Sequence, residues 1–202
     1  MDYIAVLSYE HLDNGLFLTS FARQLAQKKK RGIILHESSE YTERIIQTGV
    51  MRDEATIRCL KELNHRLVAL FADEGISTIA LNGHQKNLFQ VATNKKSIDV
   101  NFSILDKFPP EPVILISALG VTEPERNTEP ISISEAASNI QKYYNLSFID
   151  LFSTKDNSEI IVDDLPLTII PSECDTEFLK QNIPSSFHDF ESQIRLQSPS
   201  TF

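Results

Sequence analysis

Short runs of apolar residues alternate along the chain with longer segments in which apolar positions recur every three or four residues. The runs with the length of a buried strand are 3–7, 33–35, 76–81, 113–116, 146–152 and, more briefly, 159–162. Segment 16–30 has the helical spacing, and it ends in three lysines that suit a helix C-terminus. The first 36 residues therefore predict a parallel pair of strands joined by a right-handed helical crossover.

The clearest helix is predicted over residues 53–74, where leucines form a broad apolar stripe. Asp53 is the expected N-cap of this helix. Gly75 follows the last periodic position, and glycine is the residue that most often ends a helix. The next strand, 76–81, then begins directly after the helix.

Two further helices are predicted in the second half of the chain. Ser132 and Glu135 have the spacing of a capping box, in which each side chain satisfies the backbone N–H of the other residue. They mark the start of a helix over 135–144. A last helix is expected to begin at Ser172 and to run to about residue 181.

The remaining segments predict a hairpin, a loop and a tail. Runs 88–92 and 98–104 flank a polar turn at 94–96, which is typical of a β-hairpin. The polar stretch 122–129 is expected to be the longest loop. Residues 184–202 are rich in Ser, Gln and Pro and are expected to form a polar tail.

The alternation of strands and helices predicts the α/β class, as a three-layer α/β/α sandwich around a mainly parallel sheet. Any ligand site is then expected outside the carboxyl ends of the strands. We expect one α/β domain over residues 1–183, followed by the tail 184–202. One hypothesis is that this tail covers an edge of the sheet, since exposed edges invite aggregation.

Composition narrows the classes of function. The chain has 19 Lys and Arg against 28 Asp and Glu, and a net charge of −9 disfavours nucleic acid as a partner. No apolar run approaches the roughly 20 residues of a membrane span, and the N-terminus lacks the pattern of a secretory signal. We therefore expect a cytoplasmic protein without a membrane partner. The 2 cysteines and 5 histidines lack metal-ligand spacing, so no metal site is expected.

Three stretches in the middle of the chain carry the most specific pattern, namely 48–56 (TGVMRDEAT), 63–71 (LNHRLVALF) and 75–83 (GISTIALNG). They resemble the amino acid kinase family, and acetylglutamate kinases most closely. In that family a G-x-x-x-T-D-E-A-T helix start precedes an L-N-x-x-L-V-x-x-L stretch and a strand ending in L-S-G. Weaker similarities lie at 35–39, 116–120, 132–137 and 148–157, in the order that the family has them. The resemblance extends from residue 3 to about residue 182, and it implies that family's α/β sandwich and phosphoryl transfer from ATP with magnesium.

Both phosphate-binding loops that the resemblance implies are changed in this chain. After the first strand the family has K-x-G-G, but here Ser8 stands at the lysine position and Glu10 and His11 stand at the glycine positions. After the second strand the family has three glycines, where this chain has Glu-Ser-Ser at 37–39. Carboxylates repel a phosphate, and side chains occupy the space that a close approach of the backbone requires.

Other positions that the family uses are also lost. Ser132 and Ser134 stand where the family has an asparagine and an aspartate, and Val50 lies near the place of its substrate-binding arginine. The family's later G-G-M-x-x-K stretch has no counterpart before the chain ends at Phe202. The chain therefore resembles a degenerate member of the family that is shortened at its C-terminal end.

Six residues are candidates for binding a substrate because they follow predicted strands or precede a helix. They are His36, Ser38, Asn82, Gly83, Ser132 and Ser134. Each also has a structural interpretation: a histidine bonded by its neighbours, a turn, or a helix cap. No residue is assigned as catalytic, and the nucleotide-binding residues are not identified.

The sequence is compatible with three hypotheses about function. The preferred hypothesis is a pseudokinase, an acetylglutamate-kinase-like protein that uses no cofactor and has a regulatory, scaffold or partner-binding role. Its expected partners are a second copy or a working amino acid kinase. The second hypothesis is a non-catalytic sensor of an amino-acid-like ligand near 82–83 and Ser132. The third is an active kinase that transfers phosphate from ATP, with Mg, to an amino-acid-like carboxylate through a phosphate site rebuilt from Arg52, Lys86, Lys95 or Lys155.

Overall fold

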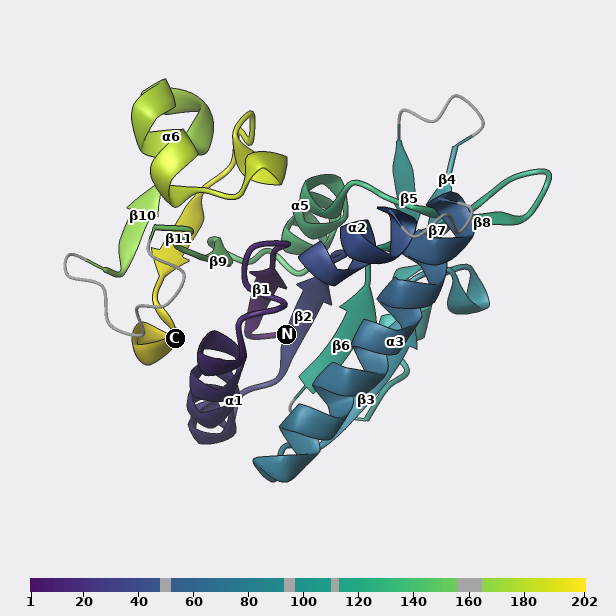
Figure 1. The fold of residues 1–202 in the computed structure, drawn as a ribbon, viewed down its shortest axis with the longest axis horizontal. Coiled ribbons are helices and arrows are strands. Elements are labelled where there is room, and N and C mark those ends of the chain that lie inside the picture. Colours follow the sequence, from purple (N-terminus) through teal and green to yellow (C-terminus); the bar gives the residue numbers. More distant parts are fainter. Residues whose placement is uncertain (48–51, 93–96, 110–112, 156–164) are drawn as a thin grey trace.

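Seven strands form one large sheet in the computed structural model, in the order β10-β11-β9-β1-β2-β6-β3 (Figure 1). The structure describes residues 1–47, 52–92, 97–109, 113–155 and 165–202. The strands are β1 (Tyr3–Leu7), β2 (Gly32–His36), β3 (Thr78–Asn82), β6 (Val113–Ser117), β9 (Ile149–Phe152), β10 (Leu167–Ile169) and β11 (Ile194–Gln197). Every neighbouring pair is parallel except β10 and β11. The mainly parallel sheet expected from the sequence is confirmed.

A smaller sheet has the order β5-β4-β7-β8. Its strands are β4 (Phe89–Val91), β5 (Ile98–Val100), β7 (Leu119–Thr122) and β8 (Asn127–Pro130). The hairpin of β4 and β5 is confirmed, although its second arm ends at Val100 and the short helix α4 (Phe102–Leu105) follows. The expected loop at 122–129 is wrong in its second half, because β8 pairs antiparallel with β7 as an edge strand with polar side chains.

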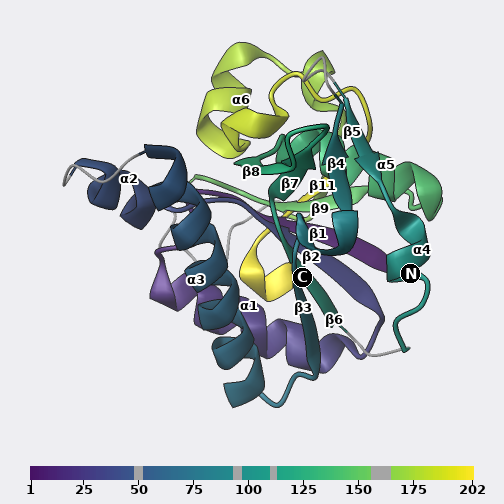
Figure 2. The ribbon, with the colours of Figure 1, turned by 90° about the vertical axis from the view of Figure 1, so that its right-hand side faces the viewer.

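Helices cover both faces of the large sheet. The remaining helices are α1 (Gly15–Lys28), α2 (Glu40–Gln47), α3 (Arg52–Asp73), α5 (Ile133–Tyr143) and α6 (Thr176–Asn182), with short 3-10 turns η1 (Gln85–Asn87), η2 (Pro171–Glu173), η3 (Ser185–Phe187) and η4 (Pro199–Thr201). Helices α1 and α3 lie on one face, and α5 lies on the other with the smaller sheet (Figure 2). The three-layer α/β/α architecture is therefore confirmed. Within the described ranges, no helix has both the length and the apolar character needed to cross a bilayer.

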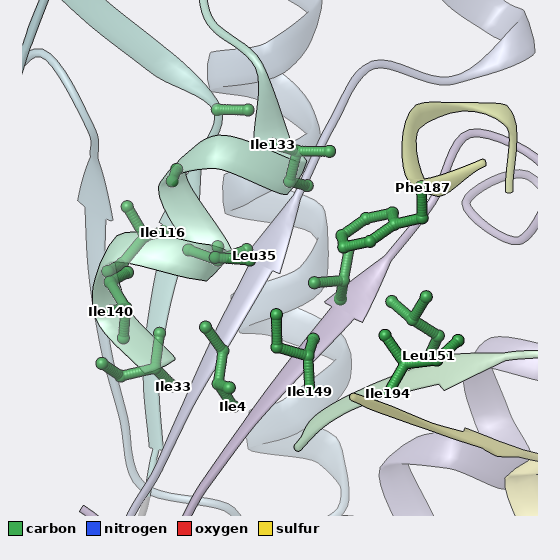
Figure 3. Packing of buried hydrophobic residues seen from close by; sticks show 14 of the residues in the cluster. Ile4, Ile33, Leu35, Ile116, Ile133, Ile140, Ile149, Leu151, Phe187 and Ile194 are labelled. Carbon is green, nitrogen blue, oxygen red and sulfur yellow. The ribbon is translucent and has the colours of Figure 1, made fainter. Parts of the chain in front are cut away.

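Alternate residues of the central strands supply the two cores. Ile4, Ile33 and Leu35 point toward α5, and Figure 3 shows them packed with Ile140 and Ile149 in that core. Their neighbours in sequence belong to the second core, under α1 and α3. Because β1 and β2 are buried on both faces, they read as continuous apolar runs in the sequence.

At the ends of α3, the predicted N-cap is wrong and the predicted glycine stop is confirmed. The helix already includes Arg52, so Asp53 lies in its first turn and is not the N-cap. An acidic residue in the first turn still complements the positive end of the helix dipole. Gly75 has φ of +75°, the left-handed conformation that ends a helix without strain only at glycine, as predicted.

The predicted caps of the later helices are confirmed in part. Ser132 is the N-cap of α5, and its hydroxyl accepts from the Glu135 N–H at 3.3 Å. The Glu135 carboxylate does not return this bond, because it accepts from the N–H of Ile98 at 2.7 Å. Helix α6 begins later than expected, with Asp175 as its N-cap in place of Ser172.

The last residues of the chain belong to the large sheet. Segment 184–202, which we expected as a polar tail, contains β11, and β11 lies between β9 and β10. Ile194 and Leu196 enter the core of Figure 3, while Arg195 lies beside Asp150 of β9. The expected strand at 159–162 and the polar turn at 94–96 fall outside the described residues.

Candidate functional site

The carboxyl ends of β1, β2, β6 and β3 meet at one edge of the large sheet. In the strand register His36 is opposite both Leu7 and Ser117, and Asn82 is opposite Ser117. Doubly wound sheets bind ligands at such an edge. The structure therefore brings His36, Ser38, Asn82 and Gly83 of the predicted site to this edge, and adds Ser117.

A buried polar cluster joins the end of β3 to α3 and β6. The Ser117 hydroxyl donates to Oδ1 of Asn82 at 3.1 Å. The Asn64 amide, on the buried stripe of α3, donates to the Leu81 carbonyl at 3.0 Å and reaches Asn82 Oδ1 at 3.4 Å. Asn64 and Ser117 are almost completely buried. The Asn82 side chain is therefore held in place by hydrogen bonds from α3 and β6.

His36 is a buried, neutral histidine in this structure. Its side chain has no exposed surface, and Nδ1 donates to the Glu37 carbonyl at 3.2 Å. Burial lowers the pKa of His36 to about 4, and the hydrogen bond to the Glu37 carbonyl opposes this lowering only in part. A ligand would have to displace neighbouring groups to reach the imidazole.

The loop after β1 is filled by its own side chains. The Ser8 hydroxyl lies 2.8 Å from Nδ1 of His11, and Nε2 of His11 lies 3.0 Å from the Ser153 carbonyl at the end of β9. Because a carbonyl only accepts, Nε2 carries the proton and Nδ1 accepts from Ser8. The His11 ring also stacks on Phe17 with centroids 4.3 Å apart. Neither Ser8 nor His11 has exposed surface, and burial lowers the pKa of His11, so it is neutral.

Two carboxylates lie together where the loops after β1 and β2 meet. The Glu37 carboxylate accepts from the Tyr9 N–H at 2.8 Å. Burial raises the pKa of Glu37 to about 7, and the nearby Glu10 carboxylate adds to this rise. Two carboxyl groups thus share this place, and the Glu37 carboxyl holds its proton more tightly than an exposed one.

Gly83 is required for close packing. A Cβ at this position would collide with the Leu119 carbonyl and the Phe89 ring. The Gly83 N–H donates to the Ser117 carbonyl at 3.2 Å, so the backbone crosses closely between the two sheets. Gly83 therefore serves a close approach of the backbone to β7 and to the Phe89 ring, and this approach is made within the protein.

Ser132 and Ser134 lie apart from the four strand-end residues. They are bonded to each other at 3.1 Å, and Ser132 lines a cavity of about 110 Å³ with Val91 and Ile98. In the described ranges no hydrogen bond joins either serine to His36, Ser38, Asn82 or Gly83. The structure thus separates the predicted substrate site into two groups.

Three of the cations suggested for a rebuilt phosphate site are described by the structure, and they are exposed and come from separate segments. Arg52 lies in the first turn of α3, Lys86 lies in η1, and Lys155 follows β9. Lys95 and Val50 fall outside the described residues. No group of three or more His, Cys, Asp or Glu side chains gathers as a metal ion would require, across the parts of the chain that are described.

The sequence analysis did not identify Asn64, Ser117 or Ser153 as hydrogen-bond partners of the residues at this edge. Asn64 offered a signal, because a polar residue inside the leucine stripe of α3 needs a buried hydrogen-bond partner. Ser117 offered none beyond its place after a strand. The hydrogen bond between His11 and Ser153 joins residues 142 positions apart in the sequence. No local sequence pattern predicts a hydrogen bond over such a separation.

Comparison with known proteins identifies the fold. No protein-family model and no curated protein sequence matches this chain. An isopentenyl phosphate kinase structure matches with a TM-score of 0.59 and 13% identity, over 76% of this chain and 73% of that chain. N-acetylglutamate synthase from Neisseria gonorrhoeae, in complex with coenzyme A and L-arginine, matches with a TM-score of 0.62 and 10% identity, over 98% of this chain and 56% of that chain.

A third match is E. coli aspartokinase III in complex with aspartate and ADP, with a TM-score of 0.56 and 8% identity, over 75% of this chain and 49% of that chain. These proteins share the amino acid kinase fold, and the chain has that fold. The fold implied by the resemblance in the sequence is thereby confirmed. At identities this low the match concerns the fold alone.

Proposed function

We propose that this chain is a catalytically degenerate protein of the amino acid kinase fold, with a regulatory, scaffold or partner-binding role in place of phosphoryl transfer. The observation that carries this proposal is the filled loop after β1. There His11 is bonded to Ser8 and to the Ser153 carbonyl, and it occupies the space that a glycine would leave for a phosphate.

Charge supports the same conclusion. Glu10 and Glu37 bring carboxylates to the place where phosphoryl transfer needs cations and backbone N–H groups. Glu37 uses the Tyr9 N–H for its own carboxylate, so this donor is already occupied. A nucleotide would have to overcome the repulsion and also displace the His11 side chain.

Thermal unfolding with and without millimolar Mg-ATP tests the proposal. A native-state ligand at 100 times its Kd stabilises by about 2.7 kcal/mol, which for a chain of this size raises Tm by about 5 to 10 °C. We expect no shift with Mg-ATP and no phosphate transfer to acetylated amino acids. A working amino acid kinase measured in parallel is the positive control. A saturable shift, or transfer above the background, would contradict the proposal.

A double variant distinguishes the two reasons why we expect no nucleotide to bind, which are the filled loop and the two carboxylates. Glu10→Gln/Glu37→Gln removes both carboxylates and keeps the filled loop. We expect this variant to remain without a shift in Mg-ATP, because His11 still occupies the loop. Nucleotide binding by the variant alone would assign the exclusion to charge. A shift of the unmodified protein with an acetylated amino acid, in the absence of nucleotide, would instead favour the ligand sensor.

A further inference from the structure

A groove follows the outer side of helix α5. Glu135, Asn139 and Lys142 line it along its length, and they recur at helical spacing on the side of α5 that does not enter the core. The part of the groove beside β5 encloses about 600 Å³, and the part beside residues 189–192 encloses about 410 Å³. Ser134, from the second group of the predicted substrate site, lines the latter part.

One wall of the groove is the free edge of a sheet. Strand β5 is the last strand of the smaller sheet, and it lies beside α5 (Figure 2). Ser97 and Asn101 use their backbone groups to bond the residues that flank β4. Because these groups alternate in direction along an antiparallel ladder, those of Ile98 and Val100 point away from β4 and toward α5.

Two side chains of α5 take the place of a neighbouring strand at Ile98. The Glu135 carboxylate accepts from the Ile98 N–H, and the Asn139 amide donates to the Ile98 carbonyl, both at 2.7 Å. Val100 directs its N–H and carbonyl to the same side, where the groove is widest. In the described ranges no side chain of α5 bonds these two groups. They therefore offer a further extended chain a donor and an acceptor.

A fixed aromatic ring lines the groove beside this edge. The Tyr143 side chain is 50% exposed. Its ring stacks on Phe102 with centroids 3.8 Å apart, and its hydroxyl donates to the Asp106 carboxylate at 2.7 Å. The ring is therefore held in one orientation while part of it stays accessible. Guanidinium and ammonium groups bind favourably over the face of such a ring.

Carboxylates outnumber cations around the groove. The acidic side chains that line it are Asp99, Glu135, Asp189 and Glu191. Among the described residues, Lys142 is the one cation that lines these two parts of the groove. Asp99, Asp189 and Glu191 are exposed, and none of them pairs with a cation in the part of the chain that the structure describes. A positively charged partner complements this charge.

We propose that the groove binds an extended, basic segment of a partner protein. The segment pairs with the edge of β5 at Val100 and places arginine or lysine side chains over Tyr143 and beside the acids. The backbone groups of the edge select an extended chain, whereas the ring and the carboxylates select its charge. The proposal holds whether or not a nucleotide binds at the loop after β1, so the two proposals fail independently.

Fluorescence anisotropy with a labelled hexapeptide of alternating arginine and valine tests the proposal. Both ends of the peptide are blocked, so that only its side chains carry charge. We expect a Kd below about 1 mM at about 0.1 M salt, and no binding of the peptide in which glutamate replaces arginine. No binding of the basic peptide, or equal binding of the two peptides, would overturn the proposal.

Methylation of the peptide backbone tests the pairing with β5. The basic peptide with alternate backbone nitrogens methylated keeps its charge and loses half of its N–H donors. We expect its Kd to rise at least about tenfold. Equal affinity of the methylated and the unmethylated peptide would exclude addition to the strand edge.

Matched pairs of acids locate the binding site. Asp99→Asn/Glu191→Gln removes one acid from each side of the groove. Glu62→Gln/Asp73→Asn makes the same change in net charge at exposed positions of α3, on the other face of the large sheet. We expect the first pair to raise the Kd at least about fivefold and the second less than about twofold. Equal effects would reduce the binding to attraction by the net charge of −9 and overturn the proposal.

Two tyrosines of similar exposure test the aromatic contact. Tyr143→Ala removes the ring that lines the groove, whereas Tyr41→Ala removes a ring of α2 that is 45% exposed. We expect a rise in Kd of at least about fivefold for the first variant and less than about twofold for the second. Unchanged binding by Y143A would exclude the proposed position of the basic side chain. Circular dichroism of every variant establishes that the chain remains folded.

Discussion

The Ser8 hydroxyl donates to Nδ1 of His11 at 2.8 Å, and this bond closes the loop that follows the first strand. The opposite nitrogen of the same ring donates to the Ser153 carbonyl, so the loop after β1 is tied to the end of β9. Both side chains are fully buried. This loop is part of the protein interior, whereas the resemblance to amino acid kinases implies a phosphate at this place.

Replacement of His11 is expected to destabilise the fold. His11→Ala removes two buried hydrogen bonds and the stacking on Phe17, and it leaves the Ser153 carbonyl without its partner. We expect a loss of about 2 to 4 kcal/mol in the free energy of unfolding, measured from urea denaturation. His65→Ala, at an exposed position of α3, is the control and is expected to change stability by less than about 0.5 kcal/mol. Equal stabilities of the two variants would contradict the described role of His11.

Glu37 is expected to make stability depend on pH. Its pKa is about 7 in the folded chain, above the ordinary value of 4.5, so the folded state keeps a proton that the unfolded chain releases first. Stability from this group is present below pH 4.5 and is lost as the pH rises through 7. Glu37→Gln keeps a neutral acceptor for the Tyr9 N–H and does not titrate.

The variant should therefore be more stable than the unmodified protein at pH 8, by on the order of 2 kcal/mol, and equally stable near pH 4. Denaturant titrations across this range measure the difference. Glu62→Gln, at an exposed position on α3, controls for the change in net charge. A difference between E37Q and the unmodified protein that stays constant with pH would count against a raised pKa at Glu37.

The ion pair of Asp150 and Arg195 is expected to stabilise the junction of β9 and β11. Arg195 donates to both carboxylate oxygens, at 2.7 and 3.2 Å, while Asp150 is fully buried. Arg195→Met leaves a buried carboxylate without its cation, and we expect it to cost about 3 to 5 kcal/mol in the free energy of unfolding.

The double variant D150N/R195M removes the buried charge as well, so it should be more stable than R195M alone. Thermal and urea denaturation of the two variants measure the coupling. If the double variant were the less stable of the two, the loss in R195M would come from packing of the Arg195 side chain on Phe148 and not from the unpaired carboxylate.

Gly83 is expected to tolerate no side chain. Gly83→Ala places a methyl group against the Leu119 carbonyl and the Phe89 ring, which forces the two sheets apart. We expect a loss of about 1 to 3 kcal/mol by thermal denaturation. Gly15→Ala is the matched control, since a Cβ there meets no atom within 4 Å, and it should leave the stability unchanged or slightly higher. A stable G83A variant would show that this crossing of the backbone can relax.

Local patterns were sufficient to predict the central architecture. The runs that became β1, β2 and β6 are mainly apolar because these strands are buried on both faces of the sheet. The run that became β3 is less buried, since β3 lies at the edge of the sheet. The leucine stripe of α3 and the glycine at its end are equally local signals. They predicted a parallel sheet covered on both faces, which the structure contains.

The C-terminal strand escaped prediction because its stability depends on a distant partner. The sequence Ile-Arg-Leu-Gln at 194–197 alternates over only four residues, and its polar members look like surface residues. Arg195 becomes a sheet residue because Asp150 lies opposite it in the register. The short, polar β8 was missed for the same reason, since only pairing with β7 makes it a strand.

By itself, the sequence determined the order of the central strands and of the helices α1, α3 and α5, because these depend on residues close together in the chain. It also determined that the lysine and glycines implied by the resemblance are absent from the loops after the first two strands. Only the tertiary structure decided what takes their place. The bond from His11 to Ser153, the cluster of Asn64, Asn82 and Ser117, and the insertion of β11 each join residues that are far apart in sequence. A buried polar group is satisfied by whatever the fold brings near it, and that neighbour is not encoded locally.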